Sequence, residues 1–406
     1  MPTLQMVSFT ITEKGYELTD AQGKFTVLVQ EDIKNGPQAA RHVMSIVTSM
    51  LYARYKSCAA PVALVSMDNC SHNGEKLSQS VLTIAKQWHN ANFVEAEFID
   101  YLANEQLITF PWTMVDKITP RPDASVKQEL TKVGLADMEP IVTSKGTFIA
   151  PFVNAEVPEY LVIEDKFPNS RPQLEAAGVY FTDRDTVNNA ERMKVTTCLN
   201  PLHTALAVFG CLLGYTRIYE EMRDPELRQL VEKIGYTEGM PVVVDPRIIN
   251  PQAFIKEVVE VRFPNPFIPD APQRIATDTS QKIKIRFGET IKSYASSESL
   301  AVADLVYIPL VIAAWFRYLL AVDDMLQPME CSSDPLLQEL QAELKGIIAG
   351  NAASYSGQLK NILKNKNIFA VDLVELGMSE QIEGMFCEML VGAGAVRGTL
   401  KKFLKI

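Results

Sequence analysis

Three side chains that can take part in acid–base chemistry stand close together in the middle of the chain, at Lys194, Asn200 and His203. Burial lowers the pKa of a lysine and lets it transfer protons, and an asparagine amide can donate to a developing alkoxide. A histidine three residues further on can orient the lysine or a substrate. The same residues also fit a plain helix start, with Asn200 as N-cap, Pro201 in the first turn and His203 in the core. From the pattern alone, the plain helix start is favoured.

Four further segments contain polar residues that add to this site. They are Ser66-Met-Asp68-Asn69-Cys-Ser-His-Asn73-Gly74, Phe110-Pro-Trp112-Thr-Met-Val115-Asp116-Lys117, Tyr160-Leu-Val-Ile-Glu164-Asp165-Lys-Phe-Pro-Asn-Ser-Arg171-Pro172 and Arg274-Ile-Ala-Thr-Asp278-Thr-Ser280-Gln-Lys282. Together with the Lys-Asn-His segment they resemble, in type and order, the motifs of the long-chain polyol dehydrogenases, the mannitol dehydrogenase and mannonate oxidoreductase family. The residues that follow Asn200 are most similar to those of the mannonate (fructuronate) oxidoreductase branch.

The resemblance implies an oxidoreductase that transfers a hydride between NAD(H) and an open-chain sugar acid or polyol. It points first to D-mannonate and D-fructuronate, with altronate or mannitol as alternatives. It implies metal-independent catalysis with Lys194 as general acid/base and with Asn200 and His203 beside it. Arg274 and Lys282 match substrate-binding positions of the family, although a run of cations alone is more typical of a solvated helix face. We expect these five side chains to converge on one pocket.

Two features differ from the family pattern. Lys194 and Asn200 are one residue further apart than in the family signature, and Trp112 stands where many members carry a second asparagine. Helices absorb a single inserted residue as a π-helical turn, so we expect one between Val195 and Leu199. On an uninterrupted α-helix, Lys194 and Asn200 would point about 120° apart.

Strand-like and helix-like runs alternate over residues 1–190, which predicts an α/β layer structure, whereas residues 191–406 are helical in pattern. In the first part, a short β-rich run ends at Asp68 and Asn69, and a helical run starts soon after Asn73. Ligands of α/β proteins bind where a strand passes through a polar turn into a helix. Asp68, Asn69 and Asn73 are therefore predicted to contact NAD, with an ordinary loop as the equal alternative.

One element of a dinucleotide-binding domain is not found in the expected place. The first thirty residues contain no glycine-rich turn between a strand and a helix. We therefore expect a partial Rossmann-like domain at residues 1–190 whose N-terminal mononucleotide-binding half is missing, and a helical substrate-binding domain at residues 191–406. This expectation raises a second function, a truncated and catalytically incompetent member that only binds a sugar acid or a partner chain.

Composition limits the partners and the compartment. A net charge of −10 and a pI near 5.1 argue against nucleic acid and anionic membranes as partners. The longest apolar run, residues 305–316, is shorter than the roughly 20 residues of a spanning helix. The six cysteines have no CxxC spacing, which predicts a reducing cytoplasm and no structural zinc. The expected partner is a small molecule, and no oligomeric state follows from the sequence.

Overall fold

The protein is described by a computed structural model that covers residues 1–20, 22–117, 119–120, 122–144 and 146–405. Its internal contacts divide the chain into two compact units. The first unit contains Met1–Lys117, Pro158–Glu191 and Pro246–Ile248, and the second contains Ile118–Val157, Arg192–Asp245 and Ile249–Ile406. The segment from 118 to 157 therefore groups with the helical unit, although its sequence lies within the range predicted as α/β.

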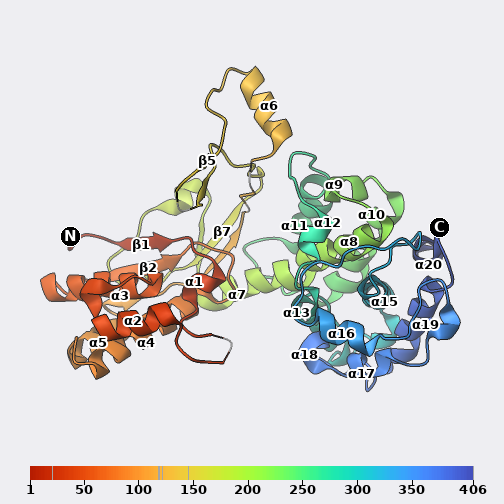
Figure 1. Cartoon of the computed structure of the whole chain (residues 1–406). Helices are drawn as coiled ribbons and strands as arrows, with labels where there is room; N and C mark the ends of the chain where they lie inside the picture. The colour runs from red at the N-terminus through yellow and green to blue at the C-terminus, as the bar shows by residue number, and fades with distance from the viewer. Residues whose placement is uncertain (21, 118, 121, 145, 406) are drawn as a thin grey trace. The chain divides into compact units, whose positions relative to one another are not determined.

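The first unit is built on a parallel sheet with the strand order β1 (Met6–Phe9), β2 (Val62–Ser66), β3 (Ile108–Thr109). All five residues of β2 are buried, as in a strand covered on both faces. Val62 and Leu64 pack into the cluster formed with the helices, whereas Ala63 and Val65 pack against Ile163 on the other face. The helices of the first face are α2 (Val27–Asn35), α3 (Val43–Ser57), α4 (Asn73–Asn90) and α5 (Ala96–Ala103), and they lie on the same side of the strands (Figure 1).

A second small sheet covers the other face. It has the order β4 (Thr113–Asp116), β7 (Tyr160–Glu164), β8 (Tyr180–Thr182), with β4 and β7 antiparallel and β7 and β8 parallel. The short helices α1 (Glu13–Tyr16), η1 (Pro37–Ala39) and η2 (Leu174–Ala177) connect these strands and helices. Helix α7 (Arg184–Arg192) follows β8 and leads the chain into the second unit.

The second unit is centred on two helices that are buried along almost their whole length, α8 (Asn200–Leu213) and α15 (Tyr307–Leu319). A helix that is apolar on all sides belongs in a core, and α15 packs on both α8 and α19 (Ser379–Met389). The surrounding α-helices are α9 (Ile218–Glu221), α10 (Pro225–Glu232), α11 (Pro251–Glu257), α12 (Pro272–Ile275), α13 (Thr279–Ile283), α14 (Glu289–Ala295), α16 (Leu337–Glu343), α17 (Leu359–Leu363), α18 (Lys366–Phe369) and α20 (Ala395–Leu404).

Four segments of this unit have π-helical hydrogen bonding. They are η3 (Met193–Cys198), η4 (Lys233–Gly239), η6 (Val258–Arg262) and η7 (Lys284–Gly288). Short 3₁₀ turns, η5 (Met240–Val242), η8 (Val302–Asp304) and η9 (Ala352–Ser354), complete the connections. Single π-helical turns are frequent at functional sites, and η3 contacts both η4 and η7.

Helix α15 receives its N-terminal cap from another element. The buried carboxylate of Glu238, at the end of η4, accepts hydrogen bonds from the N–H groups of Val306, Tyr307 and Ile308 at 2.6, 2.7 and 2.8 Å. Three otherwise unpaired donors of the first turn are thereby satisfied. The cap joins two segments that lie about seventy positions apart in the chain.

The segment from 118 to 157 forms an arm with α6 (Ala124–Lys132) and the antiparallel pair β5 (Ile141–Val142) and β6 (Phe148–Ile149). The four residues of this pair are exposed although all are apolar. The arm is held at its end by Glu156, whose carboxylate forms a buried ion pair with Arg262 at 2.6 Å.

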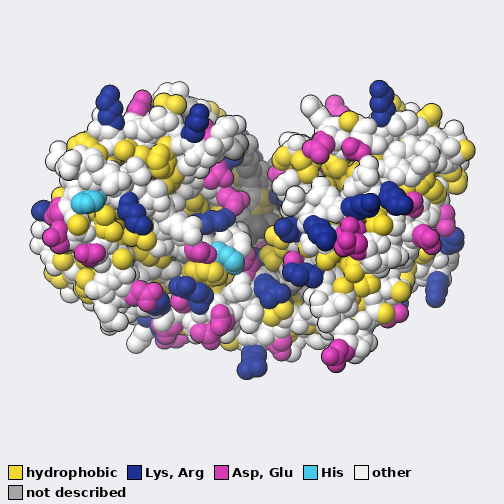
Figure 2. All heavy atoms as spheres, turned by 90° about the horizontal axis from the view of Figure 1, so that it is seen from below, with side chains coloured by type: hydrophobic (Ala, Val, Ile, Leu, Met, Phe, Trp, Pro, Cys, Tyr) yellow, Lys and Arg dark blue, Asp and Glu magenta, His cyan; other side chains and the backbone are white. Residues whose placement is uncertain are grey.

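The continuous helical run from Arg184 to Leu213 is long and apolar enough, by length and composition, to cross a membrane. However, 67% of its apolar window is buried within the fold, which is the pattern of a core helix. On the face seen in Figure 2, basic and acidic side chains are interspersed over both units.

Candidate active site

Lys194 lies in the π-helical turn that the spacing predicts. The turn η3 continues directly from α7, and the Leu199 N–H donates to the Lys194 carbonyl at 3.1 Å, five residues earlier in the chain. The side chain of Lys194 is buried, at 8% exposure. The expected π-helical turn between Val195 and Leu199 is confirmed, and it begins slightly earlier than predicted.

Asn200 starts α8 without acting as its cap. The N-cap position is Leu199, whose backbone (φ −134°, ψ −62°) breaks the helical path, and Pro201 lies in the first turn. Within the described part of the chain, the half-buried carboxamide of Asn200 has no hydrogen-bond partner. The plain helix-start interpretation of this residue is therefore wrong, and its amide is available to an oxygen of a ligand.

His203 lies one turn further along α8 and contacts an aspartate. Its Nε2 lies 2.9 Å from Asp270 Oδ2, although the alignment is poor for a hydrogen bond. The ring packs against Phe263 with centroids 4.9 Å apart. Burial lowers the pKa of His203 despite the opposing effect of Asp270, so the ring is neutral at neutral pH. With Nε2 directed to Asp270, Nδ1 is left to accept a hydrogen bond.

Arg274 binds the same aspartate from the next short helix, α12. Its guanidinium Nε donates to Asp270 Oδ1 at 2.8 Å, and its side chain is 62% exposed. Burial would raise the pKa of Asp270, but the contacts with His203 and Arg274 outweigh it and hold the pKa below its usual range. Asp270 thus links two predicted site residues, and the sequence interpretation missed it. The one available signal is its position four residues before Arg274.

A cavity of about 550 Å³ opens beside Asp270 and Arg274, within the second unit. The other lining residues are Thr119, Pro120, Pro122, Asp123, Ile268 and Pro269. Its volume is within the range of pockets that hold a small molecule. Arg274 therefore borders a space of ligand size instead of only bulk solvent.

Lys282 and Arg286 bring further positive charge to this region. The Lys282 ammonium donates to the carbonyl oxygen of Thr277, and burial together with the charge of Arg286 lowers its pKa to about 8. Arg286 donates to the hydroxyl of Thr204, the residue after His203, and burial lowers its own pKa to about 10. The charges of Arg274 and Arg286 act on the pKa of both His203 and Lys282, so these four side chains form one electrostatic cluster.

The residues predicted to contact the cofactor lie in the first unit, at the C-terminal end of β2, and all three form hydrogen bonds within the protein. Asn73 is fully buried; its amide nitrogen donates to Thr113 Oγ1 at 2.9 Å, and its oxygen accepts from Gly74 and Thr113 N–H groups. Asp68 accepts a hydrogen bond from the Tyr16 hydroxyl at 2.5 Å. Both side chains hold the turn together, whereas Asn69 is exposed and its amide nitrogen donates to the Lys117 carbonyl at 3.4 Å.

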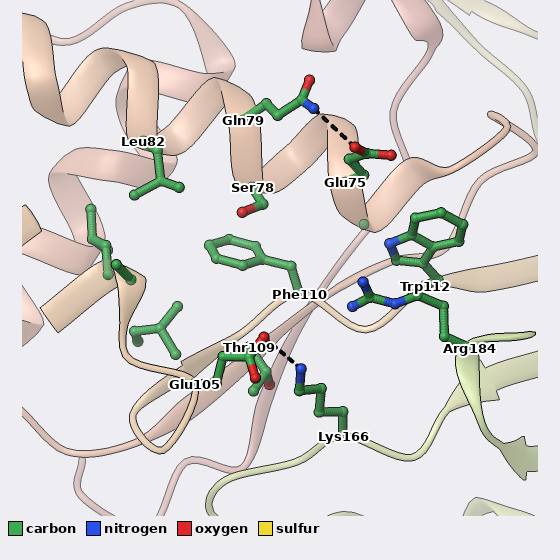
Figure 3. A pocket seen from close by; sticks show the side chains of 14 residues that line it. Glu75, Ser78, Gln79, Leu82, Glu105, Thr109, Phe110, Trp112, Lys166 and Arg184 are labelled. Atoms are coloured by element: carbon green, nitrogen blue, oxygen red, sulfur yellow. Dashed lines mark hydrogen bonds and ion pairs between the residues drawn. The ribbon is translucent and has the colours of Figure 1, made fainter. Parts of the chain in front are cut away.

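Trp112 lies in an aromatic and cationic stack in the same unit. His72 packs on its ring at 4.4 Å, and the Arg184 guanidinium lies 5.0 Å from the ring centroid. Arg184 also binds Glu164 at 3.1 Å, and Figure 3 shows it beside Trp112 at the edge of a pocket of about 400 Å³. Trp112 therefore packs beside two side chains of its own unit, at the position where the resemblance implies an asparagine in many family members.

Known proteins resemble the chain over nearly its whole length. The model of the mannitol dehydrogenase Rossmann domain matches residues 2–176, and that of the mannitol dehydrogenase C-terminal domain matches residues 186–389. The D-mannonate oxidoreductase of Thermotoga maritima is 54% identical over 99% of this chain and 74% of its own length. The mannitol 2-dehydrogenase of Pyrenophora tritici-repentis is 30% identical over 92% of this chain and 60% of its own length.

Solved structures give the same result. The mannitol 2-dehydrogenase of Pseudomonas fluorescens, solved as a ternary complex with NAD and D-mannitol, has a TM-score of 0.70 at 27% identity. The match covers 100% of this chain and 75% of that one. A D-sorbitol dehydrogenase in substrate-free form has a TM-score of 0.78 at 26% identity, covering 97% of this chain and 75% of the other.

These matches correct one expectation. The prediction that the N-terminal half of the Rossmann domain is missing is wrong, because the Rossmann model matches residues 2–176 and the structural matches extend over the whole chain. The absence of a glycine-rich turn does not determine the fold, because that turn is a local device for binding phosphate. The fold itself depends on parallel strands that alternate with helices, and β1, β2 and β3 supply them. The ground for a catalytically incompetent remnant disappears with it. By sequence and by structure, this chain belongs to the mannitol dehydrogenase family.

Proposed function

We propose that the chain is an NAD-dependent oxidoreductase that interconverts D-mannonate and D-fructuronate. The observation that carries the proposal is the Asn200 carboxamide, which has no hydrogen-bond partner among the described residues and lies just after the π-helical turn of the buried Lys194. The 54% identity with the Thermotoga maritima D-mannonate oxidoreductase supports the choice of substrate. A sugar acid carries a carboxylate, and the cations of Arg274 and Lys282 suit such a group.

The first unit has donors and acceptors that fit a nicotinamide nucleotide. The exposed carboxamide of Asn69 and hydroxyl of Thr10 follow the C-terminal ends of β2 and β1, where parallel sheets bind ligands. These groups suit the amide and the ribose hydroxyls of NAD. Asp68 and Asn73 serve the site indirectly, because they fix the turn that presents Asn69.

The reaction follows from the roles of the side chains in the second unit. In the direction of alcohol oxidation, the Lys194 amine accepts the hydroxyl proton while the Asn200 amide stabilises the negative charge on the same oxygen. His203, neutral and held by Asp270, accepts a hydrogen bond from a neighbouring hydroxyl through Nδ1. The chemistry that bound NAD supplies is acceptance of the hydride from the substrate carbon.

In this proposal, Lys194 provides the acid–base chemistry and the mechanism is independent of a metal. Activity should then be unchanged after dialysis against a chelator. Loss of activity on chelation, restored by adding a divalent metal, would contradict this part of the proposal.

The main test measures NADH oxidation by the purified chain with fructuronate and with fructose. We expect fructuronate to be the better substrate, and Lys194→Met to lower kcat by about 10²–10⁴-fold. Asn200→Ala should lower it by about 10²–10³-fold. Lys292→Met, which removes an exposed lysine in α14, is the matched control and should retain normal activity. Full activity of Lys194→Met would refute the role of the lysine, and a preference for fructose would transfer the substrate assignment to mannitol.

A further inference from the structure

The π-helical spacing of η3, continued along the chain, pairs one of its carbonyl groups with a residue that has no N–H. In this turn, the Leu199 N–H donates to the carbonyl five positions earlier. The same spacing, continued by two residues, would pair the Thr196 carbonyl with residue 201. That residue is Pro201, and proline has no N–H. The extra residue between Lys194 and Asn200 thus places a proline at the position whose main-chain N–H would donate to the Thr196 carbonyl.

A side chain from another helix supplies the donor. The Thr290 hydroxyl, in α14, donates to the Thr196 carbonyl at 3.2 Å, and Thr290 is only 3% exposed. The two residues are 94 positions apart in the chain, so the contact belongs to the tertiary structure of the unit. A buried carbonyl that loses its donor destabilises the conformation that buries it.

The turn is also confined by η4 and by the end of α7. Thr197, within the turn, packs on Gly239 of η4 so closely that a Cβ at Gly239 would lie 2.8 Å from Thr197 Cγ2. The Thr196 hydroxyl donates to the Arg192 carbonyl at 2.7 Å. The turn therefore contacts α14 and η4, and Thr290 makes the hydrogen bond that Pro201 cannot.

We propose that Thr290 is a positioning residue for proton transfer, because its hydroxyl holds η3 in the π-helical form that sets Lys194 relative to Asn200. The inference rests on the proposed function of these two residues. Without the hydroxyl, the turn shifts, and the amine and the amide no longer act on the same substrate oxygen. Such misalignment changes the rate of the chemical step more than it changes substrate binding.

The kinetic test compares Thr290→Val, which removes the hydroxyl, with Thr290→Ser, which keeps it. We expect Thr290→Val to lower kcat about 10- to 100-fold with little change in KM, and to shift the pH profile of kcat/KM. Thr290→Ser should restore both to within about threefold of the original enzyme. The matched control is Thr399→Val, which removes a buried hydroxyl that donates to a carbonyl, that of Ala395, at 2.8 Å in α20. The control should leave kcat and the pH profile unchanged.

A second measurement is independent of activity. Amide hydrogen exchange at Leu199, whose N–H closes the π-helical turn, should be faster in Thr290→Val than in the original protein or in Thr399→Val. If exchange is faster in Thr290→Val but the original protein reduces no sugar acid, the structural role of Thr290 would stand and the proposed function would be rejected. Unchanged exchange, a valine variant with the kinetics of the control, or a serine variant that fails to restore kcat would each overturn the role of the hydroxyl.

Discussion

Replacing Glu238 by glutamine should remove a pH dependence of stability that this carboxyl gives to the second unit. Burial raises the pKa of Glu238 from 4.5 to about 7, against the opposing effect of its three hydrogen bonds from the start of α15. The folded state therefore holds the proton more tightly than the unfolded state. The stability from this group is fully present below pH 4.5 and is lost as the pH rises through about 7. Between about pH 5 and pH 8, this linkage amounts to roughly 2.5 kcal/mol of unfolding free energy.

The assay needs a signal from α15 alone. The chain has three tryptophans, and changing Trp88 and Trp112 to phenylalanine leaves only Trp315, which is buried in α15. Urea unfolding of this variant, followed by fluorescence, should lose about 2.5 kcal/mol more between pH 5 and pH 8 than the same variant with Glu238→Gln. Glu380→Gln, at an exposed position of α19, is the control and should keep the original pH dependence. An equal pH dependence with and without Glu238 would refute the reasoning.

Three further substitutions test other contacts. Asp270→Asn should lower the unfolding free energy by about 1.5–3 kcal/mol near pH 7, because it removes the buried negative charge that accepts a hydrogen bond from Arg274, and calorimetry would show it. Gly210→Ala would place a Cβ 2.2 Å from the buried Glu221 carboxylate, so we expect a loss of about 1–3 kcal/mol that shrinks in a Glu221→Ala background. Gly74→Ala would place a Cβ 2.5 and 2.8 Å from two main-chain carbonyl oxygens, and should lower the melting temperature of the first unit. Unchanged unfolding in these variants would show that the described contacts do not hold in solution.

Features that lie within a single helix or turn were predicted well from the sequence. The helical runs that became α4 and α8 are visible as spacings of apolar residues, and the extra residue between Lys194 and Asn200 predicts the π-helical turn. Such features depend on neighbours a few positions away. The roles of Asn69 and Lys194 in ligand chemistry stay predictions, because the contacts of these residues within the protein do not show what a ligand would contact.

Contacts between distant elements were not predictable from the same patterns. Asp270 contacts His203 although it lies 67 positions further along the chain, and the sequence around neither residue predicts this contact. Asn73 was predicted to contact the cofactor because its residue type and its turn suit a ligand. The structure uses its donors and acceptors within the protein, since the turn at the end of β2 packs against Thr113 of β4. The residue type determines which groups a side chain is able to bind, whereas the tertiary packing determines which groups lie close enough to contact it.

The ion pair between Glu156 and Arg262 has a consequence for biosynthesis. The two residues are 106 positions apart, and they join the end of the arm to a helix of the second unit. At translation rates of about 5–20 residues per second, Arg262 is synthesised roughly 5–20 s after Glu156. During that interval the apolar strands β5 and β6 have left the ribosome while the unit that holds the arm is still incomplete. The end of the arm is therefore fixed only after the helix that carries Arg262 has been synthesised.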